Sequence, residues 1–168
     1  IPPPVVSDGP ILMATFSSGA TQGQGFKANY WFEPDYKISG TQAAPGRCHF
    51  SYISGPSSEK EGIFNSPRHP ANYPSNTDCI YELVGEPDER LMLVFSAFRY
   101  NDIDVINRSV AGYNEECNRD WLEIYVIALD GRESLFGRYC ANNAPGPILT
   151  EKGVTRARLV SHSDAADI

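Results

Sequence analysis

The spacing of four cysteines constrains this chain more than any other feature. Cys48, Cys79, Cys117 and Cys140 occur within 168 residues, and no two of them form a C-x-x-C pair. An even number without such a pair indicates a disulfide framework rather than a zinc site. Three pairings are open from spacing alone, and a bridge between sequence neighbours adds roughly 3–4 kcal/mol in the chain-entropy model. The alternative is four buried thiols in a cytosolic protein.

Composition and charge argue against several classes of protein. Hydrophobic residues make up 41% of the chain and charged residues 21%, proportions that can build a packed core. The net charge of −7 argues against a nucleic-acid partner, because phosphate binding depends on clustered Lys and Arg. The apolar run at residues 91–95 is far too short to span a bilayer, so we expect no direct membrane insertion of this chain.

Alternation of apolar side chains predicts β-strands and no long helix. Residues 121–126 (WLEIYV) have the period-two pattern of a strand with one buried face, and residues 157–164 (ARLVSHSD) continue it. Residues 90–98 (RLMLVFSAF) predict a strand that is largely covered on both faces. Turn signals at Pro87-Asp88 and Asp130-Gly131 separate these runs. We therefore expect an all-β fold, an antiparallel two-sheet β-sandwich.

A weak internal repeat predicts more than one domain. Residues 11–19 and 156–164 align at an offset of 145 residues, as from Gly19 to Asp164. The first copy continues into a further expected strand, GQGFKANYWF, whose counterpart in the second copy would begin beyond Ile168. The sequence thus predicts that residues 1–32 end a preceding domain, that residues 33–47 are a linker and that residues 48–168 form a domain lacking its last strand.

The sequence between and around the cysteines resembles the CUB domain family. The matching motifs are G-I-F-x-S-P-x-x-P-x-x-Y-P at residues 62–74, L-x-L-x-F-x-x-F at 91–98, C-x-x-D-x-L-E-I at 117–124 and G-R-Y-C at 137–140. The resemblance implies a jelly-roll-like sandwich with bridges Cys48–Cys79 and Cys117–Cys140. It also implies an extracellular binding role, in a secreted protein or in the ectodomain of a membrane protein, and it identifies residues 1–32 as the end of a preceding CUB copy.

Many CUB domains hold Ca²⁺ at one end of the sandwich, and parts of that motif are present here. Asp120 and Asp164 match two acidic ligands of the family, while the family's glutamate falls at Asn101, with Asp102 beside it. Calcium takes six to eight oxygens, so waters and carbonyls would have to complete the site. The alternative is that Asp120 and Asp164 brace loop backbone by hydrogen bonds. In calcium-binding members the acidic cluster binds a lysine or arginine of the partner.

Residues 101–116 form a longer loop than is usual in the family. Its apolar side chains, Tyr113 among them, either pack back on the sandwich or form a contact patch. We predict contact with another extracellular protein, through a basic side chain of that partner, at Asp120, Asp164 and Tyr113. Asn107 begins an Asn-Arg-Ser tripeptide, so it is a candidate for N-glycosylation.

The motifs of common enzymes are missing from the sequence, including G-x-S-x-G, H-E-x-x-H and the phosphate-binding loop. The sequence therefore predicts a non-catalytic protein-interaction module of a multidomain protein. The alternatives are an accessory substrate-binding module of an extracellular protease and a carbohydrate-binding module.

A sandwich without its last strand has an unpaired edge, which promotes association. Residues 25–32 resemble the terminal strand of a CUB domain. We hypothesise that they fill the vacancy by donor-strand complementation, within or between chains. The alternatives are a disordered tail and a fragment that does not exist alone.

Overall fold

The computed structural model describes residues 5–7, 11–32, 35–100, 117, 119–151 and 154–162, with residues 35 and 154–162 described by their backbone alone. Its elements are a 3-10 helix η1 (Asp35–Lys37) and the strands β1 (Thr41–Gln42), β2 (His49–Ile53), β3 (Cys79–Val84), β4 (Met92–Leu93), β5 (Trp121–Ala128), β6 (Glu133–Tyr139), β7 (Ile148–Leu149) and β8 (Val154–His162).

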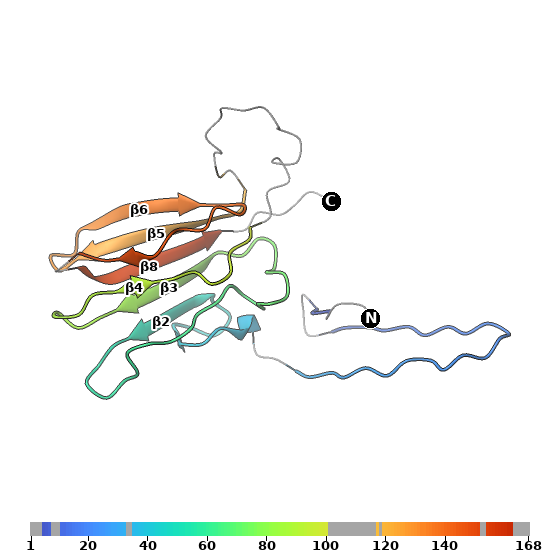
Figure 1. Ribbon diagram of the computed structural model, residues 1–168. Helices are drawn as coiled ribbons and strands as arrows, with labels where there is room; N and C mark the ends of the chain where they lie inside the picture. The colour runs from blue at the N-terminus through green and yellow to red at the C-terminus, as the bar shows by residue number, and fades with distance from the viewer. Residues whose placement is uncertain are drawn as a thin grey trace, which may run out of the picture.

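The strands form two sheets, as the sequence predicts (Figure 1). The larger sheet has the order β1-β2-β3-β8-β5-β6, and β4 pairs with β7 in the smaller one. The all-β sandwich is confirmed. Its neighbouring strands are antiparallel except for β2 and β3, which run parallel and carry the first disulfide at their start.

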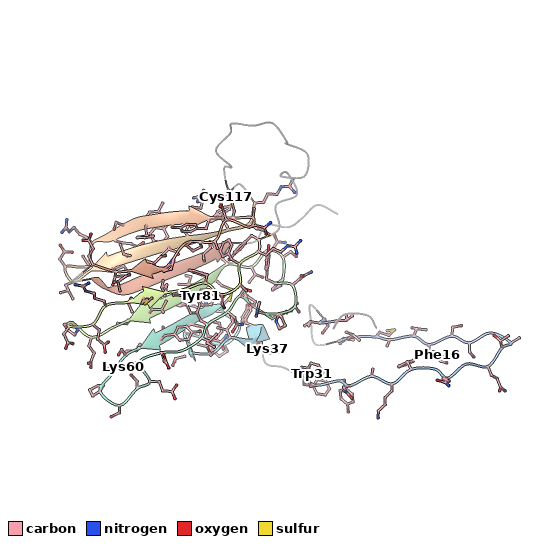
Figure 2. The ribbon with its side chains drawn as sticks, in the orientation of Figure 1. Phe16, Trp31, Lys37, Lys60, Tyr81 and Cys117 are labelled. Carbon is pink, nitrogen blue, oxygen red and sulfur yellow. A yellow bond between two sulfur atoms is a disulfide. The ribbon has the colours of Figure 1, made fainter. Side chains whose placement is uncertain are left out.

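The register of the larger sheet defines two ends of the sandwich. At one end β3 and β5 begin and β8 stops, with Cys79 opposite Ser161 and Trp121 opposite His162. We call it the Asp120 end, after the residue that precedes β5. At the other end the loop 54–61 approaches the turn 85–90, and we call it the Lys60 end. Lys60 and Cys117 mark the two ends in Figure 2.

The alternation of side chains along β5 directs every second one into the core. Leu122 and Ile124 are buried, and they belong to a cluster that combines both sheets with the first disulfide. The other buried members of this cluster are Cys48, Phe50, Cys79, Tyr81, Leu93 and Ile148. Both expected bridges, Cys48–Cys79 and Cys117–Cys140, are formed.

The prediction that residues 90–98 are covered on both faces is wrong. Leu93 is 4% exposed, but Met92 and Val94, on the opposite face of the strand, are 66% and 63% exposed. Leu91 and Phe95 pack against the core on the same face as Leu93. The physical reason is that the β4–β7 sheet forms an outer layer, so it buries only the face directed at the larger sheet.

Residues 11–32 project from the Asp120 end as an extended hairpin (Figure 1). They contain no strand, although the sequence predicts two. Phe16, labelled in Figure 2, lies on this segment well away from the sandwich, whereas Trp31 lies at the end of the segment nearer to it. A β-strand is defined by the hydrogen bonds that it makes with a neighbouring strand. Within the described part of the chain no such neighbour lies beside residues 11–32, so they are extended without being a strand.

Residues 35–47 pack along the β2 edge of the larger sheet, with η1 at the Asp120 end (Figure 1). The Tyr36 ring meets Phe50 edge to face at 6.3 Å, and the Tyr36 carbonyl accepts a hydrogen bond from the Arg68 N–H at 2.8 Å. The Tyr52 hydroxyl donates to the Ser39 carbonyl, and β1 pairs with β2. Much of the segment expected to be a linker is therefore attached to the domain that follows it.

Candidate functional site

The Asp120 side chain lies at the start of β5, where the chain enters the sandwich. Asp120 is 8% exposed, and its Oδ2 accepts a hydrogen bond from the Tyr73 hydroxyl at 2.5 Å. A buried carboxylate is costly unless donors or cations compensate its charge. The hydrogen bond from Tyr73 supplies part of this compensation and orients the carboxylate.

Aromatic packing fixes the position of Tyr73. Its ring lies 5.5 Å from that of Tyr100, which in turn lies 5.1 Å from the Phe98 ring. The Tyr100 N–H donates to the carbonyl of Ala141 at 2.8 Å, and Ala141 follows directly after the disulfide residue Cys140. The loop before β3, the segment after β4 and the second disulfide therefore meet at the Asp120 end.

The structure places one of the predicted metal and partner residues, Asp120. The other metal and partner candidates, Asn101, Asp102, Tyr113 and Asp164, lie outside the described residues, as does the glycosylation candidate Asn107. Within the described ranges, no three His, Cys, Asp or Glu side chains are grouped so that they could hold a metal ion. Sequence reasoning treated Tyr73 only as part of a family motif and missed its contact with Asp120. The sequence feature that could have drawn attention to Tyr73 is its position in the Y-P motif.

A second polar group lies on the outer face of β5 and β6. Arg138 Nε and Nη2 donate to Glu123 Oε1 at 2.9 and 2.5 Å, and the Tyr125 hydroxyl donates to Glu123 Oε2 at 2.9 Å. The Arg138 guanidinium also lies 4.8 Å from the centre of the Trp121 ring. Burial raises the pKa of Glu123, but the hydrogen bonds from Arg138 and Tyr125 outweigh it, so that this pKa is lowered overall.

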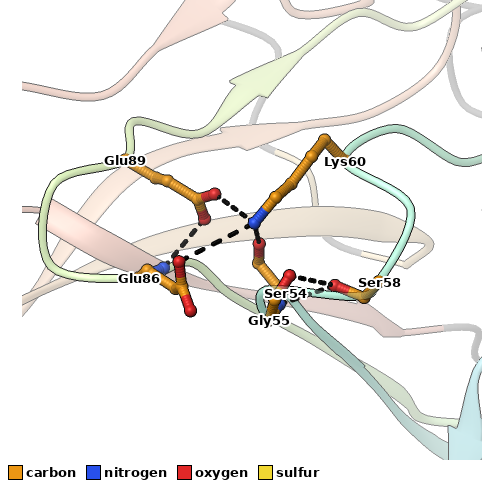
Figure 3. Close-up of polar contacts among 6 residues, drawn as sticks. All are labelled: Ser54, Gly55, Ser58, Lys60, Glu86 and Glu89. Carbon is orange, nitrogen blue, oxygen red and sulfur yellow. Dashed lines mark hydrogen bonds and ion pairs between the residues drawn. The ribbon is translucent and has the colours of Figure 1, made fainter.

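At the Lys60 end, one ammonium group joins two loops (Figure 3). Lys60 Nζ donates to Glu89 Oε1 at 2.6 Å and to Ser54 Oγ at 2.8 Å, and it lies 3.8 Å from Glu86 Oε2. The hydrogen bond from Lys60, followed by one from the Glu86 N–H, lowers the pKa of Glu89 to about 2. The same hydrogen bond raises the pKa of Lys60. This cluster holds the loop 54–61 against the turn 85–90.

Comparison with known proteins agrees with the fold and the motifs. The profile of the CUB domain matches residues 54–167. The chain therefore belongs to the CUB domain family, as its motifs predict, and like CUB domains in general it is an extracellular module. No helix in the described ranges is both long enough and apolar enough to cross a membrane.

Individual relatives are large proteins of which this chain corresponds to a small part. The chain is 34% identical to cubilin from Sus scrofa over 146 residues, which cover 86% of the chain and 3% of that protein. It is 28% identical to neuropilin-2 from Homo sapiens over 166 residues, which cover 98% of the chain and 16% of that protein. These alignments are longer than the profile match, so the similarity continues into residues before 54.

Proposed function

We propose that this CUB module is a non-catalytic binding domain that holds another extracellular protein at its Asp120 end. The observation that carries the proposal is the hydrogen bond from Tyr73 to the largely buried carboxylate of Asp120. A carboxylate held in one orientation at the end of a sandwich can bind a cation without first losing side-chain entropy. The net charge of −7 adds a field that favours a basic partner.

Calcium is the cation that the family resemblance predicts, and the donors available here fit it. Asp120 provides carboxylate oxygens, and the further proposed ligands are Asp164, Asp102 and Asn101. Asn101 follows Tyr100, whose ring contacts Tyr73, and Asp164 is two residues beyond His162, which lies opposite Trp121. Because two residues span about 7 Å at most, each of these ligands can reach this end of the sandwich. Bound Ca²⁺ would offset the repulsion between the carboxylates.

We propose that the partner contributes a lysine or arginine side chain to this acidic site. A carboxylate and a basic side chain form a charge-assisted hydrogen bond, which gives specificity and a faster approach of the two proteins. The loop 101–116, including Tyr113, is proposed to add apolar contacts, and a glycan at Asn107 would limit the directions from which a partner can approach.

We also propose that residues 1–32 are the end of a preceding module of the same kind. The alignment with neuropilin-2 covers 98% of this chain, including residues outside the profile match. Apolar side chains throughout the projecting hairpin are exposed, among them Met13 at 85% and Phe32 at 91%. Such side chains are expected to be covered by a neighbouring domain in a longer protein.

Calcium binding can be tested by isothermal titration calorimetry, with the melting temperature measured in Ca²⁺ and in EDTA. We expect saturable heat and a higher melting temperature for the natural sequence. Asp120→Asn should lose both effects, whereas Asp88→Asn, an exposed aspartate at the Lys60 end, should keep them. No heat from the natural sequence would contradict the metal site and leave Asp120 as a loop brace.

The basic-partner proposal has its own test by NMR. Lysine amide should shift the resonances of Tyr73 and Asp120 in the presence of Ca²⁺. Norleucine amide, which has a similar apolar stem but no side-chain ammonium group, should not. Equal shifts from the two amides, or none from either, would contradict recognition of a basic side chain.

A further inference from the structure

On the outer face of the larger sheet, the Arg138 guanidinium group is held firmly on one side only. Its Nε and Nη2 both donate to the same oxygen, Glu123 Oε1, at 2.9 and 2.5 Å. Its central carbon lies 4.8 Å from the centre of the Trp121 ring. The Tyr125 hydroxyl donates to the other oxygen of Glu123 at 2.9 Å and so anchors that carboxylate. The aromatic ring and the anchored carboxylate together fix the plane of the guanidinium group.

The end of the Arg138 guanidinium group is open. A guanidinium group carries five N–H donors in a rigid plane, and the two bonds to Glu123 occupy the edge formed by Nε and Nη2. The edge formed by Nη1 and Nη2 keeps one N–H on each nitrogen. Within the described ranges, neither of these two N–H groups has an acceptor. Two parallel donors of this kind match both oxygens of a carboxylate.

Solvent reaches the arginine more easily than its partner. The side chain of Arg138 is 46% exposed, whereas that of Glu123 is 13% exposed. A ligand that approaches from solution therefore meets the cation first. Because the guanidinium group is already oriented, a bound ligand does not have to restrict it further, which lowers the entropic cost of binding.

The same face of β8, β5 and β6 has more basic than acidic positions. Arg138 and two register positions of β8, Arg156 and Arg158, are basic, while Glu123 and Glu133 are acidic. Three basic positions against two acidic ones leave an excess of one positive charge, in a chain whose net charge is −7. The local charge therefore favours an anionic ligand, in contrast to the charge of the molecule as a whole.

Apolar and aromatic side chains border the open edge of Arg138. Leu135 lies opposite Tyr125 in the pairing of β5 with β6. Leu135 is 53% exposed and the adjacent Phe136 is 50% exposed. Tryptophan, tyrosine and arginine are the residues that most often dominate the binding energy of protein interfaces. We call the surface formed by Trp121, Tyr125, Leu135 and Arg138 the Arg138 face.

We propose that the Arg138 face binds an Asp or Glu side chain of another extracellular protein. The carboxylate of that side chain accepts one hydrogen bond from Nη1 and one from Nη2 of Arg138, and apolar side chains beside it pack on Leu135. The inference goes beyond the proposed binding function, because the bound charge is of the opposite sign. It uses neither Asp120 nor a metal ion, so the two proposals can fail separately.

A single carboxylate fits the Arg138 face better than a polyanion such as a sulfated glycan. Glu123, Glu133 and, opposite Arg158 on β3, Glu82 interrupt the basic positions. A polyanion would be repelled by these carboxylates and by the net charge of −7. One Asp or Glu side chain needs only the open edge of Arg138.

The test is an NMR titration of the full 168-residue chain at neutral pH in the presence of EDTA. The probe is the peptide acetyl-Leu-Glu-Leu-amide, which carries one carboxylate between two apolar side chains. We expect saturable shifts of the Arg138 Nε–H and the Trp121 indole N–H resonances. The matched peptide acetyl-Leu-Gln-Leu-amide has nearly the same shape without the charge, and it should shift neither resonance. Equal shifts from the two peptides, or none from either, would overturn the proposal.

A substitution of the arginine identifies the group that binds. Arg138→Lys keeps the positive charge but cannot offer two parallel N–H groups, so it should weaken binding at least about tenfold, read from the Trp121 resonance. Arg132→Lys is the matched control, because the Arg132 side chain is 84% exposed in its pair with Asp130, and it should leave binding unchanged. The amide spectrum of each variant checks that the sandwich is folded.

Two further outcomes would overturn the proposal. Binding that is as tight in Arg138→Lys as in the natural sequence would show that the open edge of the guanidinium group is not used. A heparin oligosaccharide that shifts the same resonances at lower concentrations than the glutamate peptide would identify a sulfated glycan, rather than a protein carboxylate, as the occupant of the Arg138 face.

Discussion

The Tyr73 hydroxyl donates a hydrogen bond to Asp120 Oδ2 across 47 positions of sequence. The contact joins the loop before β3 to the residue before β5, next to the second disulfide. Since Asp120 is 8% exposed, the orientation of its carboxylate depends on the packing around it rather than on solvent. The same contact supports the stability of this end and prepares the carboxylate for a cation.

Removal of the Tyr73 hydroxyl should destabilise the fold. Tyr73→Phe keeps the ring contact with Tyr100 but removes a hydrogen bond to a buried carboxylate, which contributes about 1–3 kcal/mol. We expect urea denaturation to show a decrease of that size in the free energy of unfolding. Tyr30→Phe is the control, because the Tyr30 side chain is 84% exposed. Equal stability of the natural sequence and Tyr73→Phe would contradict this role.

Local sequence signals predicted much of the fold. The motifs around the cysteines implied the two disulfide pairings, and side-chain alternation predicted β5 and β8, because a strand with one buried face has a period of two residues. These features depend on neighbours in sequence or on strong family motifs. The position of Asp120 at one end of the sandwich followed from the third cysteine motif in the same way.

Tertiary features were harder to predict. The contact of Tyr73 with Asp120 forms only because two segments that are distant in sequence meet in the fold. The local sequence pattern of neither segment indicates this contact. Likewise, the outer face of residues 90–98 is apolar in sequence, and its exposure depends on which strands lie outside it. The roles of Asn101, Asp102, Tyr113 and Asp164 stay predictions, because these residues lie outside the described ranges.

The ion pair at the Lys60 end should make stability depend on pH. The pKa of Glu89 is about 2 in the folded protein, below its ordinary value of 4.5. Because the ionised Glu89 is favoured in the folded protein, its ion pair stabilises the fold at pH values above the ordinary pKa. This contribution is lost as the pH falls from about 4.5 to about 2. The melting temperature of the natural sequence should therefore exceed that of Glu89→Gln near neutral pH, and the difference should vanish near pH 2.

Salt and a second variant provide the controls. The Lys60 side chain is half exposed, so added salt should reduce the difference at neutral pH. Glu59→Gln, an exposed glutamate in the same loop, should have little effect at any pH. A difference between the natural sequence and Glu89→Gln that persisted near pH 2 would show that lost packing, rather than lost charge, explains the variant.

Arg138 should stabilise the outer face of the larger sheet. It combines two hydrogen bonds to Glu123 with a position over the Trp121 ring. We expect Arg138→Met to lower the free energy of unfolding by about 1 kcal/mol. Arg138→Lys should recover only part of this, because an ammonium group cannot reproduce the planar contacts. Arg132→Met is the matched control, since the side chain of Arg132 is 84% exposed in its pair with Asp130. Equal effects of the two methionine variants would contradict a special role for Arg138.

Removal of each disulfide should destabilise a different region of the sandwich. Each closes a loop of similar length, with sequence separations of 31 and 23 residues, so the chain-entropy model gives about 3–4 kcal/mol for each. Cys48 and Cys79 belong to the buried core. The double variant Cys48→Ala/Cys79→Ala should therefore lower the melting temperature and also weaken hydrogen-exchange protection along the parallel pair β2 and β3.

Cys117→Ala/Cys140→Ala should instead act on the Asp120 end. Cys117 lies three residues before Asp120, and Ala141, next to Cys140, accepts the hydrogen bond from the Tyr100 N–H. Loss of this bridge should increase exchange of the Tyr100 amide more than that of the β2 amides, when the two variants are compared at equal global stability. Identical exchange patterns in the two variants would contradict this division, because the bridges would then act only through the unfolded chain.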